Sequence, residues 1–343
     1  ASRWVSTSPG SAMNRMIGML KHSHCHIIPD IVYNEMAERK HHEKSNHSGK
    51  KKLESGSSGI QIRIIDRKAI ITAVEKNSSA AGQGILPGWI VQKVDGKALS
   101  KSIPLVEKQY AKKSWKTLMV TASAQALLKG SLGDKIVLDL VDGTGNVVSK
   151  TITLGLPKGK SFRFGHFQLG HIWCEKKIFE KDSRVGYIAF NGFFDVNTVM
   201  PVFNEAMQQY IDEKLNGVII DLRGNPGGMP AMAMGMAGWF FDKKGLHLGY
   251  LMTRKNQLKF AILPRPDIFK GPVAVLVDGL SASTSEIFAA GFQDLKRARV
   301  FGSITAGAAL PSVFMKLPNG DAFQYLVPNC KNVAGKLLEG KGA

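Results

Sequence analysis

The chain has 343 residues, of which 44% are hydrophobic and 21% charged, so it is long enough for two domains and a substantial core. Its 46 lysines and arginines exceed its 27 aspartates and glutamates by 19, an excess that favours anionic surroundings. The basic residues are spread along the chain without a nucleic-acid-binding motif, so we expect a solvated surface and no nucleic-acid partner. No run of eighteen apolar residues occurs, so we expect no membrane span.

The cysteines and histidines do not form a recognisable metal or disulfide pattern. Three widely spaced cysteines, an odd number, indicate neither a disulfide framework nor a metal site. Three histidines fall within residues 22–26, but no carboxylate has ligand spacing to them. We therefore expect neither a metal nor an organic cofactor.

The N-terminal part is predicted to be helical. Residues 11–40 carry apolar side chains at helical spacing, interrupted by Pro29, so we predict a helix, a turn and a second helix that begins at Asp30. Residues 39–58 are polar, charged and rich in glycine and serine, which is typical of a linker or mobile loop. A small helical segment with its linker is thus predicted over residues 1–55.

A compact β-rich domain is predicted over residues 56–155, because short apolar or alternating runs are separated by glycine-containing turns. A helical segment at about Ile103–Lys129 interrupts the strands. The predicted strands are Ile60–Ile64, Ala69–Val74, Trp89–Val94, Lys135–Leu140 and Val147–Leu154.

From Phe162 onward, strands alternate with helices, which predicts an α/β fold with a largely parallel sheet. Ligands of such sheets bind at the carboxyl ends of the strands, where a Gly-rich turn (223–228) and a serine cluster are found. The predicted strands are Val185–Phe190, Gly217–Leu222, Val273–Val277 and Arg299–Gly302; the predicted helices are Asn197–Glu213, Ala231–Phe241 and Glu286 to about Lys296.

The serine cluster has two interpretations. Ser283, Thr284 and Ser285 stand between a strand and a helix, where unpaired backbone N–H groups and the helix dipole stabilise negative charge. That is the setting a serine nucleophile needs. The same residues can cap the helix, and Ser283 with Glu286 forms a capping box. Taken alone, this stretch favours capping.

Three segments together resemble one protein family. Residues 56–155 resemble a PDZ domain, with SSGIQIRI similar to its carboxylate-binding loop and strand. GVIIDLRGNPGG and VDGLSASTSEIFAAGFQD are similar to the two signature stretches of the C-terminal-processing (tail-specific) serine proteases. The resemblance covers nearly the whole chain and favours the nucleophile over the cap. It implies a crotonase-like α/β protease core over residues 156–343, with a C-terminal end that is incomplete, and an inserted PDZ-like domain.

In that family the nucleophile falls on Ser283, and its usual base is a lysine twenty-five residues later. Alanine, Ala308, stands at that position, and a side chain without nitrogen cannot take the serine proton. The tricorn-like branch of the superfamily uses a histidine before the PDZ module instead. This resemblance implies His24 as general base, Ser23 as the hydroxyl that orients it, and Glu339 as an electrostatic partner.

The remaining site residues follow from the same resemblance. The oxyanion hole would consist of the backbone N–H groups of Thr284 and of Gly227 or Gly228. A polypeptide substrate, or its C-terminus, would add as a strand to the edge that contains Gly59, Ile60 and Ile62. Relatives act in the bacterial periplasm or outside the cell, so we expect an exported serine endopeptidase whose signal peptide has been removed.

Other interpretations stay open at this point. Without the lysine, the chain could be a non-catalytic relative that binds peptides or apolar ligands. Its charge would also suit a protein that associates with anionic polymers. Cys25 beside His24 is a weaker candidate nucleophile, and the loop 224–228 lacks the Lys-Ser/Thr of a phosphate-binding loop. The sequence does not indicate whether the chain forms a homo-oligomer.

Overall fold

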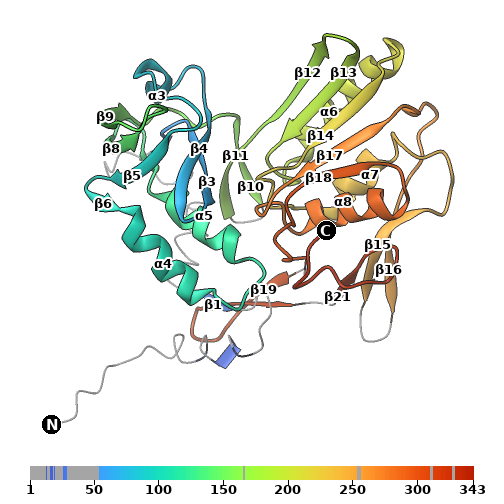
Figure 1. The fold of residues 1–343 in the computed structure, drawn as a ribbon. Helices are drawn as coiled ribbons and strands as arrows, with labels where there is room; N and C mark the ends of the chain where they lie inside the picture. Colours follow the sequence, from blue (N-terminus) through green and yellow to red (C-terminus); the bar gives the residue numbers. More distant parts are fainter. Residues whose placement is uncertain are drawn as a thin grey trace, which may run out of the picture. The chain divides into compact units, whose positions relative to one another are not determined.

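The chain divides into two compact units, one of residues 47–159 and one of residues 1–46 with 160–343 (Figure 1). The predicted helix after Asp30 and most of the predicted linker lie outside the described residues. In the N-terminal part, Met13, Met16 and Ile17 are helical. The computed structural model describes residues 13, 16, 17, 19, 26–28, 54–164, 167–252, 256–309, 312–326 and 329–343.

The unit of residues 47–159 is built on an antiparallel sheet with strand order β3-β4-β5-β8-β9, and a short pair, β2-β7, lies outside that sheet. Side chains alternate across its strands: in β8, Ile136, Leu138 and Leu140 are buried while the residues between them are more exposed. Its strands are β2 (Ser55–Ser57), β3 (Ile60–Ile65), β4 (Lys68–Val74), β5 (Ile90–Val94), β6 (Lys97–Ala98), β7 (Lys129–Ser131), β8 (Lys135–Val141) and β9 (Val147–Thr153).

The helical segment predicted at about Ile103–Lys129 is divided into two helices. The structure has two helices there, α4 (Leu99–Gln109) and α5 (Lys116–Ala126), after the short helix α3 (Ser79–Gly82). The turn between α4 and α5 lets both helices bury their apolar side chains, including Ile103 and Val120, in the same core.

The second unit contains the predicted parallel sheet, with strand order β12-β13-β14-β17-β18. Strands β13, β14, β17 and β18 are parallel, and β12 pairs antiparallel at one edge. Strands β14 and β17, which were predicted from their apolar runs, lie inside the sheet with a partner on each side. The bounds are β12 (Cys174–Glu180), β13 (Arg184–Phe190), β14 (Gly217–Asp221), β17 (Val273–Val277) and β18 (Arg299–Gly302).

Three helices, α6 (Val196–Asp212), α7 (Pro230–Ala237) and α8 (Thr284–Asp294), supply most of the core with the sheet. Helix α7 ends four residues before the predicted end, and α8 begins two residues earlier than predicted. In the described part of the chain, no helix is both long enough and apolar enough to cross a membrane.

Several strands of this unit were not predicted. They form a hairpin and two three-stranded sheets, with orders β16-β15-β21 and β1-β20-β19. In the second of these, the N-terminal strand β1 pairs with β20 from the far end of the chain. The strands are β1 (His26–Ile28), β10 (Lys160–Phe164), β11 (Phe167–Ile172), β15 (His247–Met252), β16 (Gln257–Ala261), β19 (Ser312–Lys316), β20 (Ala322–Leu326) and β21 (Asn329–Lys331).

The contact of β13 with α6 gives a test of the core. A Cβ atom at Gly186 would lie 2.5 Å from the ring of Tyr210, which is fully buried. We expect Gly186→Ala to lower the free energy of unfolding by about 1–3 kcal/mol, measured by urea denaturation, because the ring must move within a packed core. Gly217→Ala on the neighbouring strand is the control, since its nearest contact would be an ordinary 3.5 Å to the Pro272 carbonyl. Equal losses in both variants would contradict this description.

Candidate active site

Ser283 stands in the short turn that joins β17 to α8, at the carboxyl end of the parallel sheet. Its backbone has φ 53° and ψ −118°, a conformation that non-glycine residues rarely adopt and that stores about 1–3 kcal/mol of strain. Such strain is typical of turns that hold a nucleophile at the end of a strand. Ser283 is partly exposed, whereas Ser281, Thr284 and Ser285 are fully buried, so Ser283 presents the accessible hydroxyl of the cluster.

The buried hydroxyls of the cluster hold the Gly-rich loop against α8. Ser281 Oγ donates to the Leu222 carbonyl at 2.7 Å, and Thr284 Oγ1 donates to the Gly228 carbonyl at 2.6 Å. Ser285 Oγ donates to the backbone carbonyl of Asn225 at 2.9 Å. These three side chains therefore have a structural task, which separates them from Ser283.

Glycine at position 227 lets the loop come close to the nucleophile. A Cβ atom there would lie 2.7 Å from the Cβ of Ser283 and 2.6 Å from the Ala282 carbonyl oxygen, and φ is +95°. Gly228, with φ +139°, is equally constrained, because a Cβ atom would collide with the carbonyl of Phe193. The loop can reach Ser283 only with glycines at both positions.

The three predicted oxyanion donors differ in their hydrogen bonds. The backbone N–H of Gly227 donates to the side-chain oxygen of Asn225 at 2.9 Å. Within the described residues, the structure gives no hydrogen-bond acceptor to the backbone N–H of Gly228 or of Thr284. Gly228 and Thr284 are thus better suited than Gly227 to bind a substrate oxygen, and the oxyanion hole itself stays a prediction.

Ala308, which the resemblance aligns with the family's lysine, lies directly beside Ser283. The backbone N–H of Ser283 donates to the carbonyl of Ala308 at 3.1 Å, and Ala308 is 2% exposed. The segment 305–309 therefore runs past Ser283, and Ala308 has no titratable side chain.

Glu286 is the most unusual residue of the site, because its carboxylate is fully buried and is held by hydrogen bonds from backbone N–H groups and a hydroxyl. It accepts hydrogen bonds from the backbone N–H groups of Ser283 (2.9 Å), Gly307 (2.7 Å) and Ala308 (3.0 Å), and from Thr305 Oγ1 (2.7 Å). Burial raises the pKa of Glu286 to about 7, although these four donors favour the ionised form. The sequence marked this residue only as a capping and first-turn partner.

Glu339 lies on the other side of the same segment. Its Oε2 accepts the backbone N–H of Ala309 at 2.9 Å, and the N–H of Gly340 donates to the carbonyl of Gly307 at 2.9 Å. The structure thus brings Glu339 to the segment that contacts Ser283. The predicted base His24 and its partner Ser23 lie outside the described residues.

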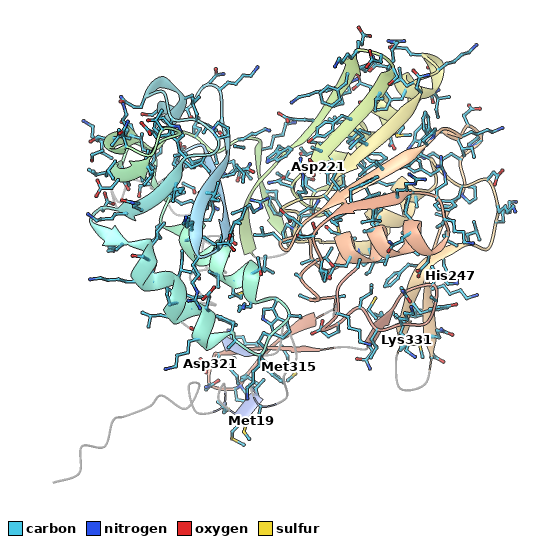
Figure 2. The ribbon with its side chains drawn as sticks, viewed as in Figure 1. Met19, Asp221, His247, Met315, Asp321 and Lys331 are labelled. Atoms are coloured by element: carbon cyan, nitrogen blue, oxygen red, sulfur yellow. The ribbon has the colours of Figure 1, made fainter. Side chains whose placement is uncertain are left out.

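An ion pair lies at the end of β14, where Asp221 is the last residue of the strand (Figure 2). Asp221 accepts hydrogen bonds from the guanidinium of Arg223 (2.6 Å) and from the Tyr187 hydroxyl (2.8 Å). Burial opposes ionisation of Asp221, but these bonds keep its pKa below the usual value. Asp278 Oδ1 also accepts the backbone N–H of Gly224 at 2.8 Å. These contacts position the start of the Gly-rich loop.

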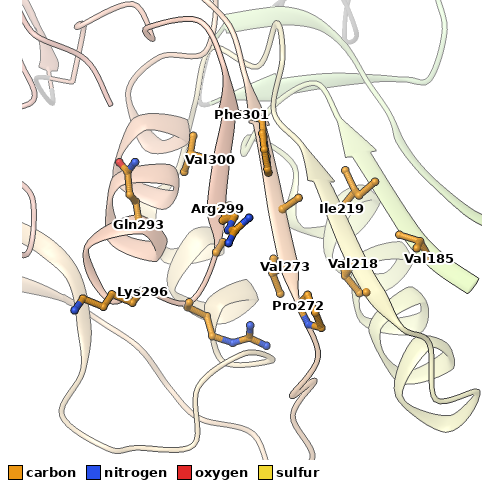
Figure 3. A pocket seen from close by; sticks show the side chains of 14 residues that line it. Val185, Val218, Ile219, Pro272, Val273, Gln293, Lys296, Arg299, Val300 and Phe301 are labelled. Atoms are coloured by element: carbon orange, nitrogen blue, oxygen red, sulfur yellow. The ribbon is translucent and has the colours of Figure 1, made fainter. Parts of the chain in front are cut away.

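Other places in this unit do not compete with Ser283. A hollow is lined by residues at the amino ends of the parallel strands, among them Val185, Val218 and Arg299, so it lies at the opposite end of the sheet (Figure 3). Among the described residues, no group of three or more His, Cys, Asp or Glu side chains is placed to hold a metal ion. Cys25 lies outside the described residues. The predicted peptide-binding residues Gly59, Ile60 and Ile62 belong to the other unit.

Burial of Glu286 predicts a pH dependence of stability. A carboxyl group whose pKa is raised on folding, from 4.5 to about 7, binds a proton more tightly in the folded state. Stability is therefore highest below the unfolded pKa and falls as pH rises through 7, by about 1.4 kcal/mol per unit at most. Glu286→Gln cannot titrate, so the difference in unfolding free energy between wild type and this variant should shrink from pH 5 to pH 8.

Urea denaturation at a series of pH values checks this expectation. Glu205→Gln, on the exposed surface of α6, is the control and should follow the wild-type pH dependence. A difference that stays flat from pH 5 to pH 8 would show that the four donors outweigh burial and that Glu286 is ionised throughout.

Comparison with known proteins shows similarity to a peptidase family. Residues 184–343 match peptidase family S41. The chain is 25% identical over 292 residues to a "Probable CtpA-like serine protease" of Staphylococcus aureus, covering 83% of this chain and 50% of the relative. The corresponding protein of Staphylococcus haemolyticus is 27% identical, with 82% and 51% covered. The chain thus spans about half the length of these relatives.

Solved structures share the fold. The photosystem II D1 C-terminal processing protease superposes with a TM-score of 0.58 at 16% identity, covering 97% of this chain and 80% of that protein. Mature CPAF gives a TM-score of 0.58 at 14% identity, covering 85% and 77%. Residues 184–343 thus resemble peptidase family S41, the similar relatives are CtpA-like serine proteases, and the solved structures share the fold.

Proposed function

We propose that this protein is a serine endopeptidase that cleaves polypeptides through an acyl-enzyme on Ser283. The observation that carries the proposal is the accessible hydroxyl at a strained turn, beside two backbone N–H groups that have no acceptor in the described part of the chain. In the reaction, Ser283 Oγ attacks the scissile carbonyl, its proton passes to the base, and the base protonates the departing amine. A water molecule then hydrolyses the ester by the same steps in reverse order.

His24 is our candidate for the base, with Ser23 and Glu339 as its supports. Ala308, at the position where the family has its lysine, has no titratable group, so the base would have to come from another segment. The choice of His24 is supported by topology: His24 is two residues before β1, which shares a three-stranded sheet with β19. Strand β19 begins at Ser312, four residues after Ala308. The N-terminal chain is therefore in the same unit as the nucleophile, although the two are far apart in sequence.

The unit of residues 47–159 would capture the substrate. Its edge strand β3 contains Gln61 between Ile60 and Ile62, and an extended peptide could pair with that edge by strand addition. We place the protein in the periplasm or outside the cell by analogy with the family, and a homo-oligomer is compatible with the proposal. The competing function is non-catalytic binding of peptides or apolar ligands, which the alanine at position 308 favours.

A fluorophosphonate probe decides between these functions. We expect covalent labelling of the wild type, none in Ser283→Ala and at least tenfold slower labelling in His24→Ala, because the probe reacts with an activated serine. Ser285→Ala is the matched control, since its hydroxyl is buried against Asn225 and should not react. Equal labelling of wild type and Ser283→Ala, measured by mass spectrometry, would support the binder.

The empty lysine position gives a second test. In a His24→Ala background, Ala308→Lys should restore part of the labelling, because its backbone already contacts Ser283 and an amine there can take the proton. The melting temperature of the double variant is measured alongside, since Ala308 is buried. A folded double variant that stays unlabelled would show that Ala308 does not correspond to the lysine position in function.

A further inference from the structure

The edge of β3 is already occupied in this structure. Helix α5 lies alongside β3 (Figure 1), and the side-chain amide of Gln125 bonds to that strand twice. Its Oε1 accepts the backbone N–H of Ile62 at 3.0 Å, and its Nε2 donates to the carbonyl of Ile60 at 2.7 Å. An amide that accepts at one residue and donates two residues away reproduces the bonds that an added strand would make. Gln125 thus makes the two backbone hydrogen bonds that one residue of a bound peptide would make.

The backbone N–H groups of the loop before β3 also have hydrogen-bond acceptors within the chain. The backbone N–H of Gly59 donates to Ser57 Oγ at 3.2 Å, and that of Ile60 donates to Ser58 Oγ at 3.1 Å. The N–H of Ser58 donates to the carbonyl of Leu128, just beyond α5, at 3.1 Å. The predicted carboxylate-binding loop and the adjoining edge therefore have no unpaired N–H group at these four residues.

We propose that Gln125 is a latch on the peptide-binding edge, which an extended polypeptide must displace in order to pair with β3. The proposal rests on the capture step of the proposed function. Because Gln125 competes for the backbone groups of Ile60 and Ile62 and not for the ligand's side chains, it raises the Kd of every extended ligand by the same factor. It therefore restricts capture to segments that are fully extended and available in high local concentration.

The contacts of Gln125 suit a reversible latch. Its side chain is half-buried, near the end of α5, and is connected to the helix by rotatable bonds, so it can leave without moving the backbone. One turn earlier on the same helix face, Thr121 is 1% exposed, and its hydroxyl has no hydrogen-bond partner in the described residues. A structural tie would complete the local hydrogen bonding, whereas this interface leaves a buried hydroxyl unsatisfied beside the latch.

The experiment measures peptide affinity in the full-length chain with Ser283→Ala, so that the probe is not cleaved. The probe is a fluorescein-labelled decapeptide that ends in Ala-Val-Ala with a free carboxylate, followed by fluorescence anisotropy. We expect Gln125→Ala to lower Kd about tenfold, because the ligand no longer displaces two hydrogen bonds. Gln125→Glu, which keeps an acceptor for Ile62 but loses the donor to Ile60, is the second variant and should change Kd less. Ser123→Ala, on the exposed face of α5, is the control.

Hydrogen exchange of the segment 59–65 separates a latch from a structural tie. In Gln125→Ala without peptide, the amide of Ile62 should exchange faster than in the Gln125 protein, and added peptide should protect it again. Equal or weaker affinity in Gln125→Ala would overturn the latch and leave peptide capture standing. Absence of binding in both proteins would overturn capture and latch together. Neither result affects the fluorophosphonate labelling of Ser283, which tests catalysis separately.

Discussion

The geometry around Ser283 depends on one buried carboxylate. Glu286 accepts four hydrogen bonds, one from the nucleophile's own N–H and three from the segment 305–308. An unpaired buried charge would cost several kcal/mol, so the fold keeps Glu286 only because these donors converge on it. These hydrogen bonds fix the segment 305–308 beside the turn, and they hold Ser283 in a conformation that it would not adopt in a flexible loop.

The Gly-rich loop is fixed from the opposite side by a different type of contact. Hydroxyls of the serine cluster donate to its carbonyls, and Asn225 connects it to β13 through the Phe190 carbonyl at 2.9 Å. These bonds turn the carbonyls of the loop toward α8, and the glycines then leave the N–H of Gly228 and that of Thr284 without acceptors in the described structure. The cluster therefore caps α8, since Ser283 is the N-cap residue and forms a capping box with Glu286, and it also leaves Ser283 partly exposed.

Sequence patterns were sufficient for the parallel sheet and the serine turn but not for the contacts between distant segments. The run that became β17 is apolar throughout and that of β14 is apolar up to Asp221, a pattern typical of buried parallel strands, and Ser283 lies in the turn that follows β17. The strands of the small sheets are short or irregular and acquire their conformation from partners, as β1 does from β20. Glu286 looked like a cap because its buried partners come from the segment 305–308, which local spacing cannot reveal. Gln125 likewise gave no signal, since its partners are 63 and 65 residues away.

The same contacts limit where a proton acceptor can approach Ser283. The segment 305–309 is hydrogen-bonded to both Glu286 and Glu339, and its Ala308 carbonyl accepts the backbone N–H of Ser283. The Gly-rich loop covers a second side, where an added Cβ atom at Gly227 would already collide with the turn. In the mechanism that we propose, the base would come from a segment other than these two. The N-terminal chain is our candidate because β1 and β19 belong to one sheet and β19 begins four residues after Ala308.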